Sequence, residues 1–148
     1  MSTTVAKRAV GRLRPKFLAV CRPNIDLDSC ANYPIYITDY ECTNPHHQEV
    51  EENRVSFFSG HSSYSMTTAV FIAFYLHARL SKAIYSHTTI PMLQFALVAS
   101  ASFIGWSRWV DHNHHWSDVL IGQIVGAVIG YLVIKHVAKM FRTTKVDL

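Results

Sequence analysis

Three long runs without a charged residue constrain this chain more than any other feature of its sequence. The runs lie between Arg54 and Arg79, between Lys82 and Arg108, and between Asp118 and Lys135. Each run can supply the ~20 residues that a helix needs to cross a bilayer core of about 30 Å. The pattern therefore predicts three membrane-spanning helices, at about residues 62–80, 89–107 and 116–136.

Three buried helices of a soluble bundle are the alternative explanation of these runs. Such helices have apolar residues at i, i+3, i+4 and i+7 and a charged outer face. The segments TTAVFIAFYL, MLQFALVASASFIGW and VLIGQIVGAVIGYLVI are instead apolar on all sides, with small residues where helices can approach closely. We therefore predict an all-α integral membrane helical bundle, a single domain over residues 1–148 with three spanning helices, a short N-terminal helix end and a long lumenal loop.

The positions of the charges predict how the helices cross the membrane. Basic residues occur in the turn HARLSK after the first span and in the tail KHVAKMFRTTK after the third. Short positively charged loops stay in the cytosol, so the polar segments at the opposite helix ends share the extracellular or lumenal face of a plasma or endoplasmic reticulum membrane. Seven of the ten acidic residues lie between Asp26 and Glu52. This distribution fits a multi-pass membrane protein, and no nucleic-acid partner is expected despite the net charge of +4.

The connection from Pro15 to Phe58 lies on the same face and carries all three cysteines, Cys21, Cys30 and Cys42. In an oxidising compartment, one disulfide in any of three pairings would leave one thiol over. Three free thiols are an equally plausible alternative.

Two cations near the N-terminus, Lys7 and Arg14, are seven residues apart, which corresponds to two helical turns and one helix face. Arginine binds phosphate through a planar fork, and lysine adds a point charge. A basic membrane flank is the simpler explanation. It conflicts with the topology, because these cations precede the lumenal loop, so we interpret them as ligands for an anion.

The segment FFSGHSSYSM opens the first expected span. Ser59 and Gly60 stand where free backbone N–H groups and the helix dipole favour an anion, and glycine allows close backbone approach. His61 follows directly and could donate a proton to a leaving group. A capping or interfacial histidine is the competing interpretation.

The segment SRWVDHNHHWSDVL precedes the third expected span. His114 and Asp118 are four residues apart, a spacing at which the carboxylate can accept the imidazole N–H, and Arg108 can reach the same pocket. A zinc site formed by His112, His114 and His115 is the alternative. Nearby cations would repel a metal ion, so we predict no metal and no cofactor, and phosphoryl transfer as the chemistry.

Together these clusters resemble the signature of the type-2 phosphatidate phosphatase superfamily, K-x6-R-P, then S-G-H, then S-R-x5-H-x3-D. The matching residues are Lys7, Arg14 and Pro15, then Ser59, Gly60 and His61, then Ser107, Arg108, His114 and Asp118. The segments GRLRPKFLAVC, SFFSGHSSYSM and HHWSDVLIGQIVGA resemble the animal lipid phosphate phosphatases, and the similarity covers nearly the whole chain. That family has six spanning helices, so the resemblance implies a truncated fold without the first two helices and most of the third.

The resemblance also implies an activity. Family members hydrolyse phosphatidate, lysophosphatidate, sphingosine 1-phosphate and ceramide 1-phosphate without a metal. His114 would be the nucleophile that forms a phosphohistidine, Asp118 would orient it, and His61 would protonate the leaving lipid alcohol. The residues that would hold the phosphate are Lys7, Arg14, Ser59, Gly60 and Arg108.

Two other functions fit parts of the pattern. An inactive membrane partner would associate with full-length relatives, using apolar surface that missing helices leave open, and homo- or hetero-oligomers would follow. A vanadate haloperoxidase would use the same pocket, but such relatives are typically soluble. The complete motif set favours the phosphatase, because an inactive partner needs neither His61 nor His114.

Overall fold

The computed structural model describes residues 2–25, 37, 39–80 and 86–137, and within them the chain is all-α, as predicted. The helices are α1 (Ser2–Val10), α2 (Phe17–Cys21), α3 (His47–Asn53), α4 (Gly60–Leu80), α5 (Ser86–Val110) and α6 (Trp116–Leu132), which continues as the π-helical segment η2 (Val133–Val137). The only β-type pairing in these residues is an isolated bridge between Pro23 and Cys42.

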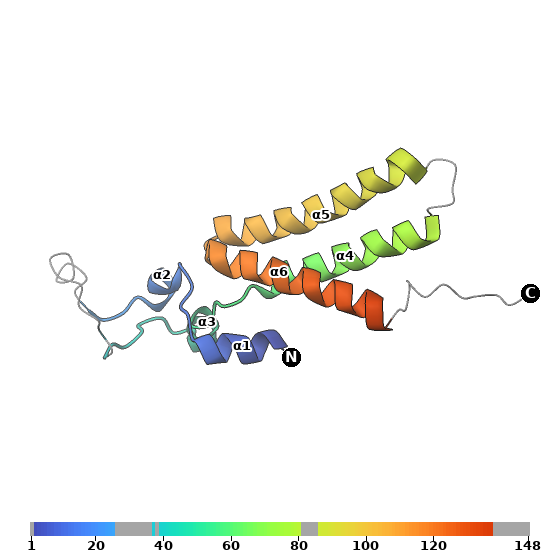
Figure 1. Cartoon of the computed structure of the whole chain (residues 1–148). Helices are drawn as coiled ribbons and strands as arrows, with labels where there is room; N and C mark the ends of the chain where they lie inside the picture. Colours follow the sequence, from blue (N-terminus) through green and yellow to red (C-terminus); the bar gives the residue numbers. More distant parts are fainter. Residues whose placement is uncertain (1, 26–36, 38, 81–85, 138–148) are drawn as a thin grey trace, which may run out of the picture.

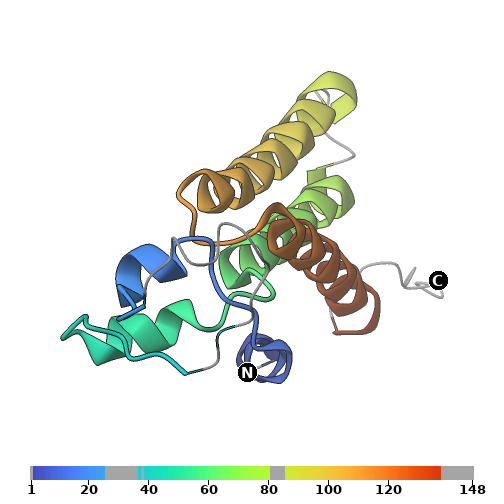
Figure 2. The ribbon, with the colours of Figure 1, turned by 90° about the vertical axis from the view of Figure 1, so that its left-hand side faces the viewer.

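The three long helices lie side by side, and α4 packs against both α5 and α6 (Figure 1). They correspond to the three spans expected at 62–80, 89–107 and 116–136, with α4 and α5 beginning two and three residues earlier. Pro91 lies inside α5, where it removes one backbone hydrogen bond of the helix. α1, α2 and α3 gather where α5 ends and α6 begins (Figures 1 and 2).

Two of the three long helices are long and apolar enough to cross a membrane: Thr88–Val110, and Trp116–Val137 at the end of the described chain. Only 17% and 33% of their most apolar windows are buried, so most of their apolar surface faces outward, unlike a soluble core helix. Of the three spanning helices predicted from the sequence, α5 and α6 are therefore supported as candidate spans by length and composition. α4 spans 21 residues but is not apolar enough to be counted with them.

The reason is that α4 is the central helix and carries hydroxyl side chains against its neighbours. Thr67 Oγ1 donates to the Gly126 carbonyl at 3.0 Å, and Ser65 Oγ lies 3.4 Å from the Ala101 carbonyl oxygen. Hydroxyl groups that bond a neighbouring backbone can be buried between helices at little cost. Their presence lowers the apolar character of α4 but increases its contact with α5 and α6.

Glycines on α6 allow its backbone to approach α4 closely. A Cβ at Gly122 would lie 2.7 Å from the Ser59 carbonyl oxygen, and a Cβ at Gly126 would collide with the Ser63 carbonyl oxygen. The two helices can therefore pack at this distance only because these positions lack side chains.

A disulfide joins Cys21 to Cys42 and so selects one of the three pairings considered from the sequence. The third cysteine, Cys30, lies outside the described residues. Around the disulfide, Phe17 and Val50 form a small core that links α2 to α3. Arg54 covers this core with its guanidinium over the Phe17 ring, 5.3 Å from the centroid. The segment is thus a small folded unit attached to the helix ends.

Gly126→Val tests the close approach of α4 and α6. The added side chain would meet the Ser63 backbone, so the helices must separate, and we expect a loss of about 1–3 kcal/mol of stability. The measurement is the thermal unfolding midpoint in detergent. Val128→Ile on the exposed side of the same helix is the control. Equal midpoints for both variants would show that the glycine does not determine this packing.

Candidate functional site

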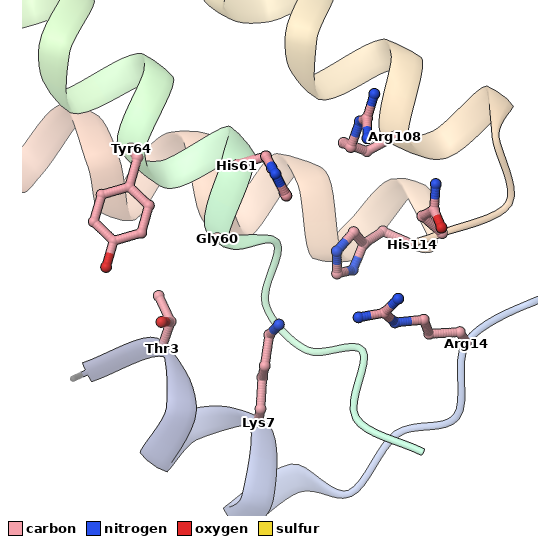
Figure 3. Close-up of a pocket in the computed structure, with 9 residues that line it drawn as sticks. Thr3, Lys7, Arg14, Gly60, His61, Tyr64, Arg108 and His114 are labelled. Carbon is pink, nitrogen blue, oxygen red and sulfur yellow. The ribbon is translucent and has the colours of Figure 1, made fainter. Parts of the chain in front are cut away.

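A cavity of about 340 Å³ lies at the end of the bundle where α4 and α6 begin and α5 ends. Five parts of the chain contribute to it: α1, the loop before α2, the start of α4, the end of α5 and the turn before α6 (Figure 3). The lining residues are Thr3, Lys7, Arg14, Gly60, His61, Tyr64, Arg108, Asn113 and His114. The three sequence clusters therefore converge, as their expected membrane topology required.

Six of the eight predicted site residues line this cavity: Lys7, Arg14, Gly60, His61, Arg108 and His114. The other two, Ser59 and Asp118, are fully buried behind the cavity wall. They support the lining but do not belong to it.

Lys7 and Arg14 reach the cavity by a different route from the one that the spacing predicts. α1 ends at Val10, and Gly11 has a φ of +59°, a conformation that glycine adopts readily. Arg14 therefore lies in a loop, where its backbone N–H donates to the Asn53 carbonyl at 2.9 Å. The prediction of one shared helix face was wrong, although both side chains point into the cavity (Figure 3).

Two cations of the cavity, Lys7 and Arg14, form no ion pair with any described residue. Burial, with the charge of Arg14, lowers the pKa of Lys7, while Glu52 opposes the change. Burial likewise lowers the pKa of Arg14. The Nε atom of Arg14 is buried with no hydrogen-bond partner in the described part of the chain. An anion in the cavity would supply the missing partner and offset the repulsion.

Arg108 contributes a third cation from the end of α5. Its guanidinium is held loosely, at 3.4 Å from the Asp111 carboxylate, and this ion pair is partly exposed. Pairs of this kind contribute little to stability, so the Arg108 side chain can turn toward an anion at small cost.

The start of α4 presents its backbone to the cavity. Gly60 is the first residue of the helix and lines the cavity, so the positive end of the helix dipole lies beside the cations. Ser59 faces the other way: its Oγ accepts a hydrogen bond from the Ser62 hydroxyl at 2.9 Å, and its backbone N–H donates to the Asp118 carbonyl at 3.1 Å. Its hydroxyl thus bonds the start of α4 and is turned away from the cavity.

His114 is almost fully buried, with 3% of its surface exposed, and its ring contributes to the cavity wall. The expected direct contact with Asp118 is replaced by an indirect one. His114 Nδ1 lies 3.3 Å from Ser56 Oγ, and the Ser56 hydroxyl in turn donates to Asp118 Oδ2. α6 begins only at Trp116, so His114 precedes the helix and the i, i+4 relation does not apply.

Burial, together with the Arg14 and Lys7 cations, lowers the pKa of His114 from 6.5 to about 4, although Asp118 and Ser56 act in the opposite direction. The ring is therefore neutral near pH 7 and keeps a lone pair. The unfolded chain binds a proton more readily than the folded one between about pH 6.5 and 4, so this group favours unfolding as the pH falls through that range.

The histidines do not assemble a metal site in the described residues, where no group of three His, Cys, Asp or Glu side chains could hold an ion. The ring of His115 turns away from the cavity, with its Nε2 atom 3.0 Å from the Leu13 carbonyl oxygen. Of the three histidines considered for zinc, His114 lines the cavity, and His112 and His115 do not.

Sequence reasoning missed five residues of the site. Thr3, Tyr64 and Asn113 line the cavity, and Arg12 and Ser56 hold Asp118 from behind. Arg12 lies within the first motif and Ser56 lies shortly before the second, but their partner Asp118 is 106 and 62 positions away, respectively. No local spacing could indicate contacts at such separations.

Comparison with known proteins finds related sequences. The model of the PAP2 superfamily matches residues 1–142. Phospholipid phosphatase 1 of Rattus norvegicus is 48% identical over 143 residues, covering 97% of this chain and 49% of that protein. Phospholipid phosphatase 2 of Mus musculus is 41% identical over 141 residues, covering 95% and 49%. The chain spans about half the length of the curated relatives it matches, and no solved structure matched it.

Lys7→Met tests the electrostatics of the cavity. Removing this cation should raise the pKa of His114 from about 4 toward 6.5, because Lys7 disfavours the protonated ring. The measurement is an NMR titration of labelled histidine. Arg8→Met, at a neighbouring α1 residue outside the cavity lining, is the control and should leave the titration unchanged. Equal pKa values in wild type and Lys7→Met would refute the assignment of the cation to this cavity.

Proposed function

The chain belongs to the PAP2 superfamily, and from that premise we propose that it is a membrane-bound, metal-independent lipid phosphate phosphatase. Its substrates are phosphatidate, lysophosphatidate, sphingosine 1-phosphate and ceramide 1-phosphate. One observation carries the proposal: a polar cavity with three cations and two histidines lies at the end of helices whose apolar surface faces outward. A molecule with a phosphate head and a hydrocarbon tail fits that combination.

The phosphate is held by positive charge from several elements. Lys7 and Arg14 bind its oxygens from one side, where the buried Nε of Arg14 lacks a partner among the described residues. Arg108 and the backbone at Gly60 bind from the other side. Ser59 assists indirectly by bonding the first turn of α4. Fixed donors of this kind stabilise the charge on the phosphoryl oxygens as the transition state forms.

The first chemical step transfers the phosphoryl group to His114. The Nε2 lone pair attacks phosphorus, the bond between phosphorus and the lipid oxygen breaks, and protonated His61 gives its proton to that oxygen. The products are a lipid alcohol, a phosphohistidine and neutral His61. The low pKa of His114 supports this role, because the ring is unprotonated at neutral pH.

The second step hydrolyses the phosphohistidine. Neutral His61 takes a proton from water, the water oxygen attacks phosphorus, and the bond between phosphorus and Nε2 breaks. Inorganic phosphate leaves, and His114 and His61 return to their starting states. No metal or further cofactor enters either step.

The proposed location is a plasma or endoplasmic reticulum membrane, with the cavity at the extracellular or lumenal face. The two apolar helices support this location, and the disulfide supports the oxidising side. α4 would be the third span, shielded from lipid by its position between α5 and α6.

A second candidate is a catalytically inactive membrane partner. It is favoured by the exposed apolar surface of α5 and α6, which another helix could cover. Such a chain would associate with full-length relatives and modulate them, without releasing phosphate itself.

Phosphate release from phosphatidate and lysophosphatidate in detergent micelles with EDTA distinguishes the two candidates. Wild type should release phosphate, His114→Ala should abolish release, and His61→Ala should lower it by ~100-fold to 10,000-fold. His112→Asn is the matched control, because asparagine tolerates the φ of +54° at this residue outside the cavity lining. Failure of folded wild-type protein to release phosphate would leave the inactive partner as the better explanation.

A further inference from the structure

We propose that Ser56 and Arg12 are positioning residues for this reaction: the Ser56 hydroxyl links Asp118 to His114, and Arg12 holds the Asp118 carboxylate in place. The inference rests on the proposed function for its catalytic meaning. Its structural part rests on hydrogen bonds that join Ser56, Arg12, Asp118 and His114.

The Asp118 carboxylate is fully buried and uses both of its oxygens. Arg12 Nη1 donates to Oδ1 at 2.8 Å, while Oδ2 accepts from the Ser56 hydroxyl and from the His115 backbone N–H at 3.2 Å. A buried carboxylate needs such compensation to stay ionised. With these donors in place, the carboxylate has no direct hydrogen bond to His114 in the described structure.

The available donors and acceptors determine which ring nitrogen of His114 carries the proton. A serine hydroxyl has one hydrogen, and Ser56 gives it to Asp118, so only its oxygen lone pairs remain for the ring. Nδ1 of His114, 3.3 Å away, therefore carries the ring proton and donates it to Ser56, whose backbone also hydrogen-bonds the ring. Nε2 then holds the lone pair, which is the arrangement that a nucleophile needs.

The same chain of bonds responds when the ring gains positive charge. As Nε2 binds phosphorus, the Nδ1–H becomes more acidic and its hydrogen bond to Ser56 strengthens. The Ser56 hydroxyl is polarised by the Asp118 carboxylate behind it, so the negative charge acts on the ring through the hydroxyl. Asp118 thus stabilises the charged ring without touching it.

Arg12 connects this support to the anion-binding loop. Its backbone carbonyl accepts from the Ser56 N–H at 2.8 Å, and its side chain also donates to Ser117 at 2.7 Å. Arg14 follows two residues later and lines the cavity. One short loop therefore holds both the phosphate ligand and the carboxylate that serves the nucleophile.

The first test compares Ser56→Ala, Ser56→Thr and Arg12→Met in phosphate release from lysophosphatidate. Ser56→Ala and Arg12→Met should lower kcat by ~10-fold to 100-fold with KM little changed, and Ser56→Thr should restore part of the loss. Ser117→Ala is the matched control, since it removes another Arg12 contact but none to the carboxylate. Wild-type kcat in Ser56→Ala, or a loss as large in Ser117→Ala, would overturn the proposal.

The second test needs no turnover. Nitrogen-15 NMR of labelled histidine should show His114 as a single Nδ1–H tautomer in wild type and a mixture of tautomers in Ser56→Ala. An unchanged tautomer in Ser56→Ala would contradict the role of the hydroxyl, even if activity falls. If wild type releases no phosphate but shows the expected tautomer change, the proposed function fails and the hydrogen-bond linkage stands.

Discussion

A carboxylate that is fully removed from water must be paired, and at Asp118 the paired cation comes from the opposite end of the chain. Arg12 lies 106 positions away and bonds the carboxylate at 2.8 Å. Asp118 also meets the start of α4 through its backbone, because the Ser59 N–H donates to the Asp118 carbonyl. The N-terminal loop, α4 and α6 are therefore held together at one buried residue, and the cavity forms beside it.

The charges around the cavity form two groups, one behind the cavity wall and one within it. Behind the wall, Arg12 and Asp118 satisfy each other and are stable without a ligand. Within the wall, Lys7 and Arg14 repel each other and only Glu52 opposes this among the described residues, so a bound phosphate would balance their charge. His114 lies between the two groups, and its low pKa reflects its burial first and then the positive charge on the cavity side. Because the paired charges are separate from the cavity cations, a neutral histidine can lie beside a bound phosphate.

The sequence predicted the architecture well because long uncharged runs leave a chain few choices in folding. It also predicted that the polar clusters converge, because consecutive helices cross the membrane in opposite directions and so place every second connection on the same face. It failed where a single residue changes local geometry. Gly11 ends α1 before Arg14, and α6 starts after His114, so neither helical spacing applied. Ser56 and Arg12 went unnoticed because their partner is distant in sequence. The sequence shows the serines and threonines of α4, but not the central position in which they bond the neighbouring helices.

The central claim is that His114 receives the phosphoryl group, and trapping that group tests it most directly. Wild-type protein would be mixed with radiolabelled lysophosphatidate, quenched in alkali to preserve phosphohistidine, and digested for peptide mapping. The account predicts label on the peptide that carries His114, and none after His114→Ala. Label at His61, or label that persists in His114→Ala, would contradict it.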